Sequence, residues 1–150
     1  MKAISIRQPY AALIVAGIKN IENRTWATRY RGPLAICASK AMSADDVQFE
    51  RQWCRENGIP FPEPLLRGGI IGIADLVGIF RPAKNPENAA FECDGVLYEM
   101  LLPSDQLPDS MDWYVEGAIG WVLANPRPVK FVKYRGKLGL FSIPDDLLEL

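Results

Sequence analysis

The longest apolar segment of the chain, residues 68–80, is rich in isoleucine and valine and is interrupted by Gly69, Gly72 and Gly78. Branched aliphatic residues favour strands, and glycines within a strand mark bends or the close approach of another backbone. The segment therefore predicts one long, bent barrel strand. Asp75 interrupts it, and because an isolated buried charge is very costly, this carboxylate must pair with a cation or face a ligand cleft.

Shorter strands and two helices are expected around this segment. Pro9 and Gly17 bound a short apolar helix at residues 10–16, and Ser43 caps a second helix that runs to Glu56. The predicted strands are residues 2–7, 22–26, 34–39, 96–102, 118–123, 129–134 and 139–142, and residues 144–148 predict a short C-terminal helical turn. We predict an α+β, mainly β chain of the broad α/β class, folded as one domain, residues 1–150, around a small β-barrel.

Several classes of chemistry are excluded by the composition. Histidine is absent, so imidazole catalysis and imidazole metal ligands are excluded. Cys37, Cys54 and Cys93 are too far apart for a Cys-x-x-Cys ligand pair, and no glycine-rich phosphate loop is present. We expect no metal and no cofactor. We also expect a cytoplasmic protein without a membrane partner, because no apolar run approaches the ~20 residues of a membrane span.

Charge is distributed unevenly, although the net charge is only −1. Residues 1–40 hold seven basic residues and one acid, and residues 127–137 hold five basic residues and no acid. If these ends meet, they form a positive surface that attracts phosphate; otherwise they are scattered, solvated lysines and arginines. Residues 85–118 carry eight acids and no base, which indicates a solvated insertion or a rim that selects partners.

Charged residues also gather in the short segment between Gly17 and Trp26. Side chains alternate along a strand, so Glu22, Arg24 and Trp26 share one face. That face carries an acid, a guanidinium and an indole. A surface ion pair between Glu22 and Arg24, with no ligand, is the simplest alternative.

The spacing in Gly17-Ile18-Lys19-Asn20-Ile21-Glu22-Asn23-Arg24 resembles the Gly-x-Lys-x-x-Glu-x-Arg signature of ASCH domains, which belong to the PUA-like superfamily of RNA-associated β-barrels. Residues 5–10, 120–128 and 136–144 also resemble parts of that domain, so the likeness covers most of the chain. It implies a PUA-like barrel. ASCH domains include RNA binders, proposed nucleases and amidohydrolases that act on acetylated cytidine.

The first functional hypothesis is binding of RNA, a nucleotide or a modified nucleoside. Lysine and arginine hold phosphate or a base carbonyl, tryptophan stacks on the ring, and an acid or amide reads its polar edge. Core packing is the alternative for both tryptophans, and it is favoured for Trp121, whose neighbours are apolar. Gln8 can equally cap the first helix. The ligand-binding candidates are Gln8, Lys19, Glu22, Arg24, Trp26, Trp121 and Asn125.

The second hypothesis is hydrolysis, and whether the protein is an enzyme stays open. The resemblance to the amidohydrolases implies a lysine at position 19 that works with a threonine three residues later, but Glu22 stands at that position. A modified mechanism needs Lys19 together with Glu22 or Asp75 to activate water. RNA cleavage by Lys19 with Tyr10 or Ser39 rests on family analogy alone. We favour binding over hydrolysis.

Overall fold

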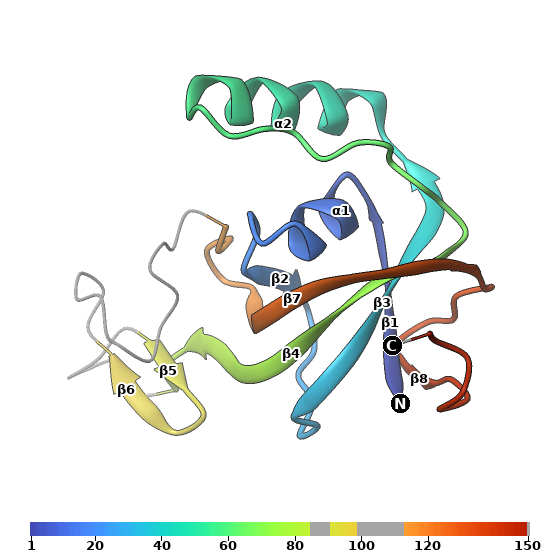
Figure 1. The fold of residues 1–150 in the computed structure, drawn as a ribbon. Coiled ribbons are helices and arrows are strands. Elements are labelled where there is room, and N and C mark those ends of the chain that lie inside the picture. The colour runs from blue at the N-terminus through green and yellow to red at the C-terminus, as the bar shows by residue number, and fades with distance from the viewer. Residues whose placement is uncertain (85–90, 99–112, 150) are drawn as a thin grey trace. The chain divides into compact units, whose positions relative to one another are not determined.

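The computed structural model describes residues 1–84, 91–98 and 113–149 (Figure 1). Two helices interrupt the run of strands. The elements are β1 (Lys2–Gln8), α1 (Tyr10–Val15), β2 (Ile21–Arg24), β3 (Gly32–Met42), α2 (Ala44–Glu56), β4 (Gly69–Pro82), β5 (Phe91–Cys93), β6 (Val96–Tyr98), β7 (Ile119–Lys133) and β8 (Leu140–Ser142). The mainly β, α+β class is therefore confirmed.

The strands form a mixed sheet with the hydrogen-bonded order β2-β7-β4-β3-β1-β8, in which β5 pairs with β4 and β6 with β5. β1 and β3 are parallel, whereas β1 and β8 and also β2 and β7 are antiparallel. This path has two ends, so over the described residues the sheet is not closed into the predicted barrel. The C-terminal helical turn is not confirmed either, since residues 144–148 form a turn with one hydrogen bond, from Leu147 N–H to Pro144 O (3.2 Å).

The two strands expected at residues 118–123 and 129–134 are one strand, β7. The prediction separated them because Pro126 and Pro128 fall between. The strand continues through this region with Asn125 at a φ of +49°, a left-handed conformation that asparagine tolerates better than most residues. The strand expected at residues 96–102 begins as predicted, and its second half lies outside the described residues.

Backbone contacts divide the chain into two compact units. Unit 1 comprises Met1–Lys19, Pro33–Ala74 and Asn125–Leu150, and unit 2 comprises Asn20–Gly32 and Asp75–Ala124. The single domain expected over residues 1–150 stays a prediction.

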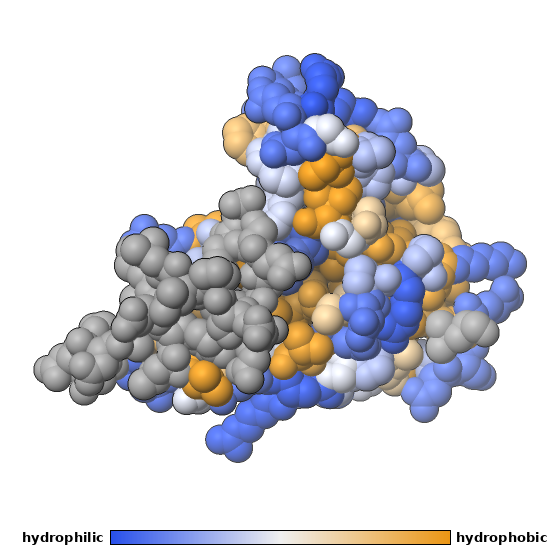
Figure 2. All heavy atoms as spheres, turned by 60° about the vertical axis from the view of Figure 1, so that its left-hand side comes forward, coloured by the Kyte–Doolittle hydropathy of each residue, from blue (hydrophilic) through white to orange (hydrophobic). Residues whose placement is uncertain are grey.

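Unit 1 has an apolar core between β1, β3 and β4. Ala3 and Ala35 face each other across the parallel pair of strands, and Ile70, Ile73 and Phe141 belong to the same buried cluster. Ser43 caps helix α2 as predicted, because its hydroxyl accepts a hydrogen bond from Asp46 N–H (3.2 Å). Hydrophilic residues cover the outward side of α2 (Figure 2).

Unit 2 has its own smaller core. Phe80, Cys93 and Val122 are buried in it, with Phe91 and Tyr114 packed against them. The rings of Phe80 and Tyr114 meet edge to face at 4.8 Å. This packing fixes the start of β7, and β2 is paired to that part of β7. All three cysteines of the chain are free and buried.

Candidate functional site

The Glu22–Arg24 pair lies on β2 in unit 2. The register with β7 sets Glu22 opposite Trp121 and Arg24 opposite Ile119. Glu22 Oε2 and Arg24 Nη2 are 3.1 Å apart, and the two side chains are 12% and 24% exposed. The predicted common face of these two residues is therefore confirmed. Their partial exposure leaves both groups within reach of a ligand.

Trp26 follows the end of β2, and its position depends on Trp121. The two rings meet edge to face, with centroids 4.8 Å apart and an interplanar angle of 82°. The indole N–H of Trp121 donates a hydrogen bond to Trp26 O (3.1 Å). Trp121 is fully buried, whereas Trp26 is partly exposed. Trp121 is therefore a core residue that packs against Trp26, as the core-packing alternative predicted, and its contact with a ligand stays a prediction.

Asp75 lies in the unit 2 part of β4, where it is partly buried. Burial, followed by the negative charge of Asp75, raises the pKa of Tyr30. Asp75 therefore interacts electrostatically with Tyr30 within this unit. Its predicted part in activating water stays a prediction.

Lys19 belongs to unit 1, where the chain folds back onto the end of α1. Gly17 takes a φ of +79°, and the N–H groups of Ile18 and Lys19 both donate to Leu13 O at 2.9 and 3.0 Å. This left-handed glycine was predicted from its place after the helix. The lysine is only 5% exposed, and its Nζ lies 5.7 Å from the centroid of the Tyr10 ring.

Glu50, on α2, is the acid that accompanies Lys19. It is 7% exposed and is hydrogen-bonded to the Tyr10 hydroxyl. Burial raises the pKa of Glu50, the positive charge of Lys19 opposes that rise, and the nearby Asp46 adds to it. Burial and the charges of Asp46 and Glu50 also raise the pKa of Tyr10 to about 12, so Tyr10 stays protonated and donates to the carboxylate. In this cluster of Lys19, Tyr10 and Glu50, burial favours the protonated form of Glu50 beside the positive charge of Lys19.

Sequence reasoning missed Glu50. The same helix carries the apolar residues Val47 and Cys54. Glu50 lies three residues after Val47 and four before Cys54, so the same helical spacing places all three on one face. An acid at that position in an otherwise apolar stripe was the available signal for a buried carboxylate.

Gln8 is fully buried, and both ends of its amide bind the backbone. Its Oε1 accepts a hydrogen bond from Ala12 N–H (2.9 Å), and its Nε2 donates to Leu66 O (2.8 Å). The alternative prediction, that Gln8 caps the helix, is confirmed. No part of the side chain reaches the surface, which favours the cap, and the contact of Gln8 with a ligand stays a prediction.

Asn125 lies on β7 in unit 1, and its side chain is exposed. Its backbone carbonyl accepts a hydrogen bond from Arg127 Nη1 (2.8 Å). The predicted contact of Asn125 with the edge of a base stays a prediction.

Within the described parts of the chain, no group of three or more cysteines and carboxylates is placed to hold a metal ion. None of the helices described is long and apolar enough to cross a membrane.

One family model and two protein sequences match parts of this chain. A model of the ASCH domain matches residues 4–133. The human and mouse proteins named activating signal cointegrator 1 (Homo sapiens and Mus musculus) are each 33% identical to this chain over 78 residues. Those residues make up 49% of this chain but only 13% of each relative. The match thus spans a small part of these longer proteins.

Solved structures show a similar fold. Crystal structures of two mutant forms of an ASCH protein from Zymomonas mobilis align with 96% of this chain, covering 90% and 88% of theirs. The TM-scores are 0.51 and 0.50, and the sequences are 16% identical. At this level of identity the likeness concerns the fold alone.

Proposed function

Because the chain belongs to the RNA-associated ASCH domain family, we propose that it binds RNA or a nucleotide, including a modified nucleoside, through the β2 face of unit 2. We call Glu22, Arg24 and Trp26 the β2 site. One observation carries the proposal: a partly exposed indole, fixed by a buried tryptophan, follows a partly exposed acid–guanidinium pair. A cytoplasmic location is part of the same proposal.

Each group of the β2 site suits one part of a nucleotide. The Trp26 ring offers a flat surface on which a base can stack, and such stacking contributes about 1 to 3 kcal/mol per base. The guanidinium of Arg24 forms short, charge-assisted hydrogen bonds with phosphate or with a base carbonyl. The Glu22 carboxylate accepts hydrogen bonds from amino groups at the edge of a base. Together they favour a ligand with a ring, an anionic group and a polar edge.

Contacts within unit 2 hold the β2 site in place without a ligand. Trp121 holds the Trp26 backbone by a hydrogen bond and its ring by an edge-to-face contact. Asn23, on the opposite face of β2, donates to Trp113 O (2.7 Å) and accepts from Val115 N–H (3.0 Å). A side chain that is already ordered loses less conformational entropy when it binds a ligand, which raises affinity.

The test is binding of uridine and cytidine monophosphates, measured by calorimetry. Trp26→Ala should weaken binding by about 5-fold to 150-fold, as expected for the loss of one stacked base. Trp53→Ala, which removes a partly exposed tryptophan from α2 in unit 1, is the matched control and should bind like the wild type. Unchanged affinity in folded Trp26→Ala protein would refute the proposal.

Hydrolysis is the second candidate, and it is favoured by the buried Lys19–Tyr10–Glu50 cluster. Burial raises the pKa of Glu50 and so favours the protonated acid as a proton donor, and a lysine beside it can stabilise a developing negative charge. Against this stands Glu22, at the position where the related amidohydrolases have threonine.

We expect no appreciable hydrolysis of acetylated cytidine or RNA by the purified protein. Turnover that disappears in both Lys19→Arg and Glu50→Gln, while mononucleotide binding persists, would establish the hydrolase instead. Arginine cannot serve as a base near neutral pH, and glutamine cannot transfer a proton, so this pair of variants tests the chemistry directly.

A further inference from the structure

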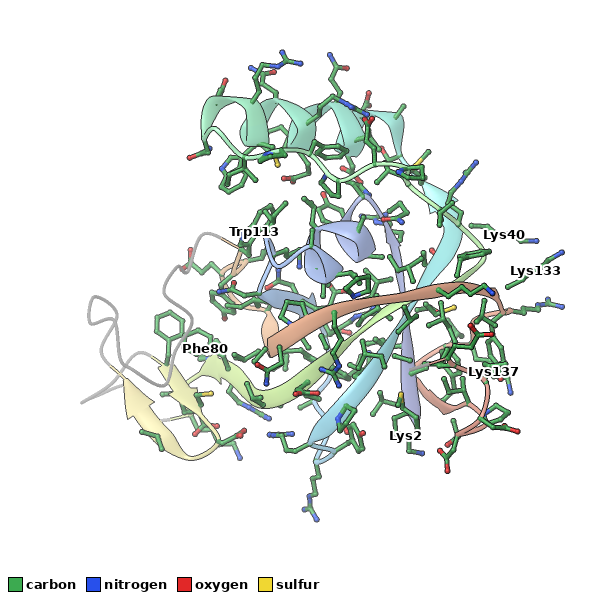
Figure 3. All side chains as sticks on the ribbon, in the orientation of Figure 1. Lys2, Lys40, Phe80, Trp113, Lys133 and Lys137 are labelled. Carbon is green, nitrogen blue, oxygen red and sulfur yellow. The ribbon has the colours of Figure 1, made fainter. Side chains whose placement is uncertain are left out.

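A second group of cations lies in unit 1, where β3 and β7 end and β4 begins. Gly68 N–H donates to Ala38 O (2.7 Å), and Tyr134 N–H donates to Gly68 O (3.1 Å). These bonds place the three segments that carry Lys40, Arg67 and Lys133 next to one another. Figure 3 shows Lys40 and Lys133 projecting on the same side of the molecule.

Among the residues that the structure describes, these cations have no acidic partner. Lys40, Arg67 and Lys133 are exposed, and none of them forms an ion pair with any carboxylate in the described part of the chain. Arg67 Nη1 instead donates to Lys40 O (3.1 Å), which fixes its guanidinium beside the lysine. By contrast, Lys130 on the same strand lies 3.7 Å from Glu149. The three unpaired charges therefore form a local positive surface.

An aromatic ring lies among these cations. Phe131 is 38% exposed, and side chains alternate along a strand, so it shares one face of β7 with Lys133. Its ring rests directly on the backbone at Gly69, since a methyl group there would lie 2.6 Å from two ring carbons. Gly69 thus supports one part of the ring, and the exposed part is open to a ligand.

We infer that Lys40, Arg67, Phe131 and Lys133, here called the β7 basic face, bind single-stranded RNA. The inference takes its ligand class from the proposed function but concerns a different surface. Cations that follow a phosphate backbone, combined with an aromatic ring on which a base stacks, are the usual means of binding single strands without sequence preference. On this surface the lysines and Arg67 contact successive phosphates, and Phe131 stacks on one base.

The exposed ring favours a single strand over the other polyanions. In a duplex the bases are already stacked and paired, so Phe131 would contribute little to binding a double helix. An acidic peptide offers carboxylates to the cations but no flat ring for Phe131. Loss of affinity when Phe131 is replaced therefore separates single-stranded RNA from both alternatives.

The experiment titrates a fluorescent ten-residue oligouridylate into the full chain and measures anisotropy at several salt concentrations. Lys133→Ala should weaken binding and reduce the slope of log affinity against log salt by about 0.7, as expected for one lost phosphate contact with a single strand. Phe131→Leu should weaken binding about fivefold or more and leave that slope unchanged. Lys133→Arg keeps the charge and should retain the slope.

Two matched controls lie outside the β7 basic face. Lys130→Ala removes a lysine of the same strand that already lies near Glu149, and Phe49→Leu removes a phenylalanine that is 69% exposed on α2. Both should bind the oligonucleotide within about twofold of the wild type, a change too small for a lost stacking contact. If Lys133→Ala and Phe131→Leu behave like these controls, the inference is wrong.

Further ligands separate this inference from the proposed function. Uridine monophosphate should bind the two β7 variants as it binds the wild type, because that measurement reports the β2 site. If Trp26→Ala abolishes oligonucleotide binding while the β7 variants retain it, the further inference fails and the proposed function stands. If decaglutamate or an RNA duplex binds as tightly as the single strand, and Phe131→Leu changes neither, the surface recognises polyanions in general and the inference is overturned.

Discussion

The ten residues from Gly17 to Trp26 supply charged groups to both units, and the two groups differ in burial. In unit 1, Lys19 is 5% exposed and interacts with Tyr10 and Glu50. In unit 2, the Glu22 and Arg24 side chains are 12% and 24% exposed and pair with each other. A single sequence motif therefore contains both an enclosed charge and an accessible one.

Burial determines what each charge can do. Taking a charge out of water is costly, and the structure must compensate it with partners, so replacing a buried charge changes stability and protonation. The Glu22–Arg24 pair is also largely buried but keeps some contact with solvent, which leaves it accessible to a ligand. We therefore expect changes around Lys19 to affect folding and changes around Arg24 to affect binding. Four predictions test this contrast.

The largest effect is expected from removing the buried ring of Trp121, which contacts Trp26. Trp121→Ala should lower the free energy of unfolding by about 3 to 5 kcal/mol, the range for a deleted buried aromatic side chain. Urea denaturation followed by circular dichroism measures this change. Trp26→Ala is the comparison and should lose less stability, since its ring is partly exposed. A Trp121→Ala protein as stable as the wild type would show that the β2 site does not depend on the buried ring.

The second prediction concerns the buried charges of Lys19 and Glu50. Lys19→Met keeps a long, unbranched side chain but removes the cation beside Glu50, and it should destabilise the protein by about 2 to 3 kcal/mol at pH 8. At pH 5 part of this loss should be recovered, because Glu50 can then bind a proton and become neutral. Lys137→Met, at an exposed position, is the control. An equal loss at both pH values would mean that Lys19 contributes by packing alone.

The third prediction concerns the proton on Glu50. Its pKa is higher in the folded protein than in the unfolded chain, so its contribution to stability is complete below the unfolded pKa and is lost as pH rises through the folded pKa. Glu50→Gln mimics the neutral acid. Relative to wild type, it should be unchanged at low pH and more stable, on the order of 1 kcal/mol, at pH 8.

Thermal and urea unfolding from pH 4 to pH 8 test this sign, with Glu56→Gln as a control at an exposed site on the same helix. A Glu50→Gln protein that becomes less stable than wild type as pH rises would show that the ionised carboxylate is net stabilising in the fold. The protonation argument for the hydrolase candidate would then also fail.

The fold class and the common face of Glu22 and Arg24 could be predicted because both follow from local periodicity. The caps at Ser43 and Gly17 were equally predictable, since they depend on residues close in sequence. The partner of Lys19 was not: Glu50 is 31 positions further along, and only packing brings its helix to Tyr10. Sheet closure is not confirmed over the described residues, and it could not be predicted reliably because strand periodicity does not specify whether the end strands pair.

The smallest change in stability is expected at the Glu22–Arg24 pair. A clear loss of mononucleotide affinity is nevertheless expected there. Arg24→Lys keeps the positive charge beside Glu22, so the free energy of unfolding should change by less than about 0.5 kcal/mol. Lysine is a point charge and lacks the planar fork that holds two oxygens of a phosphate at once, so mononucleotide affinity should fall about tenfold. Arg29→Lys, at an exposed position in the same unit, controls for a general change in surface charge. If Arg24→Lys loses stability but keeps its affinity, Arg24 serves the fold and the assignment of the two regions must be reversed.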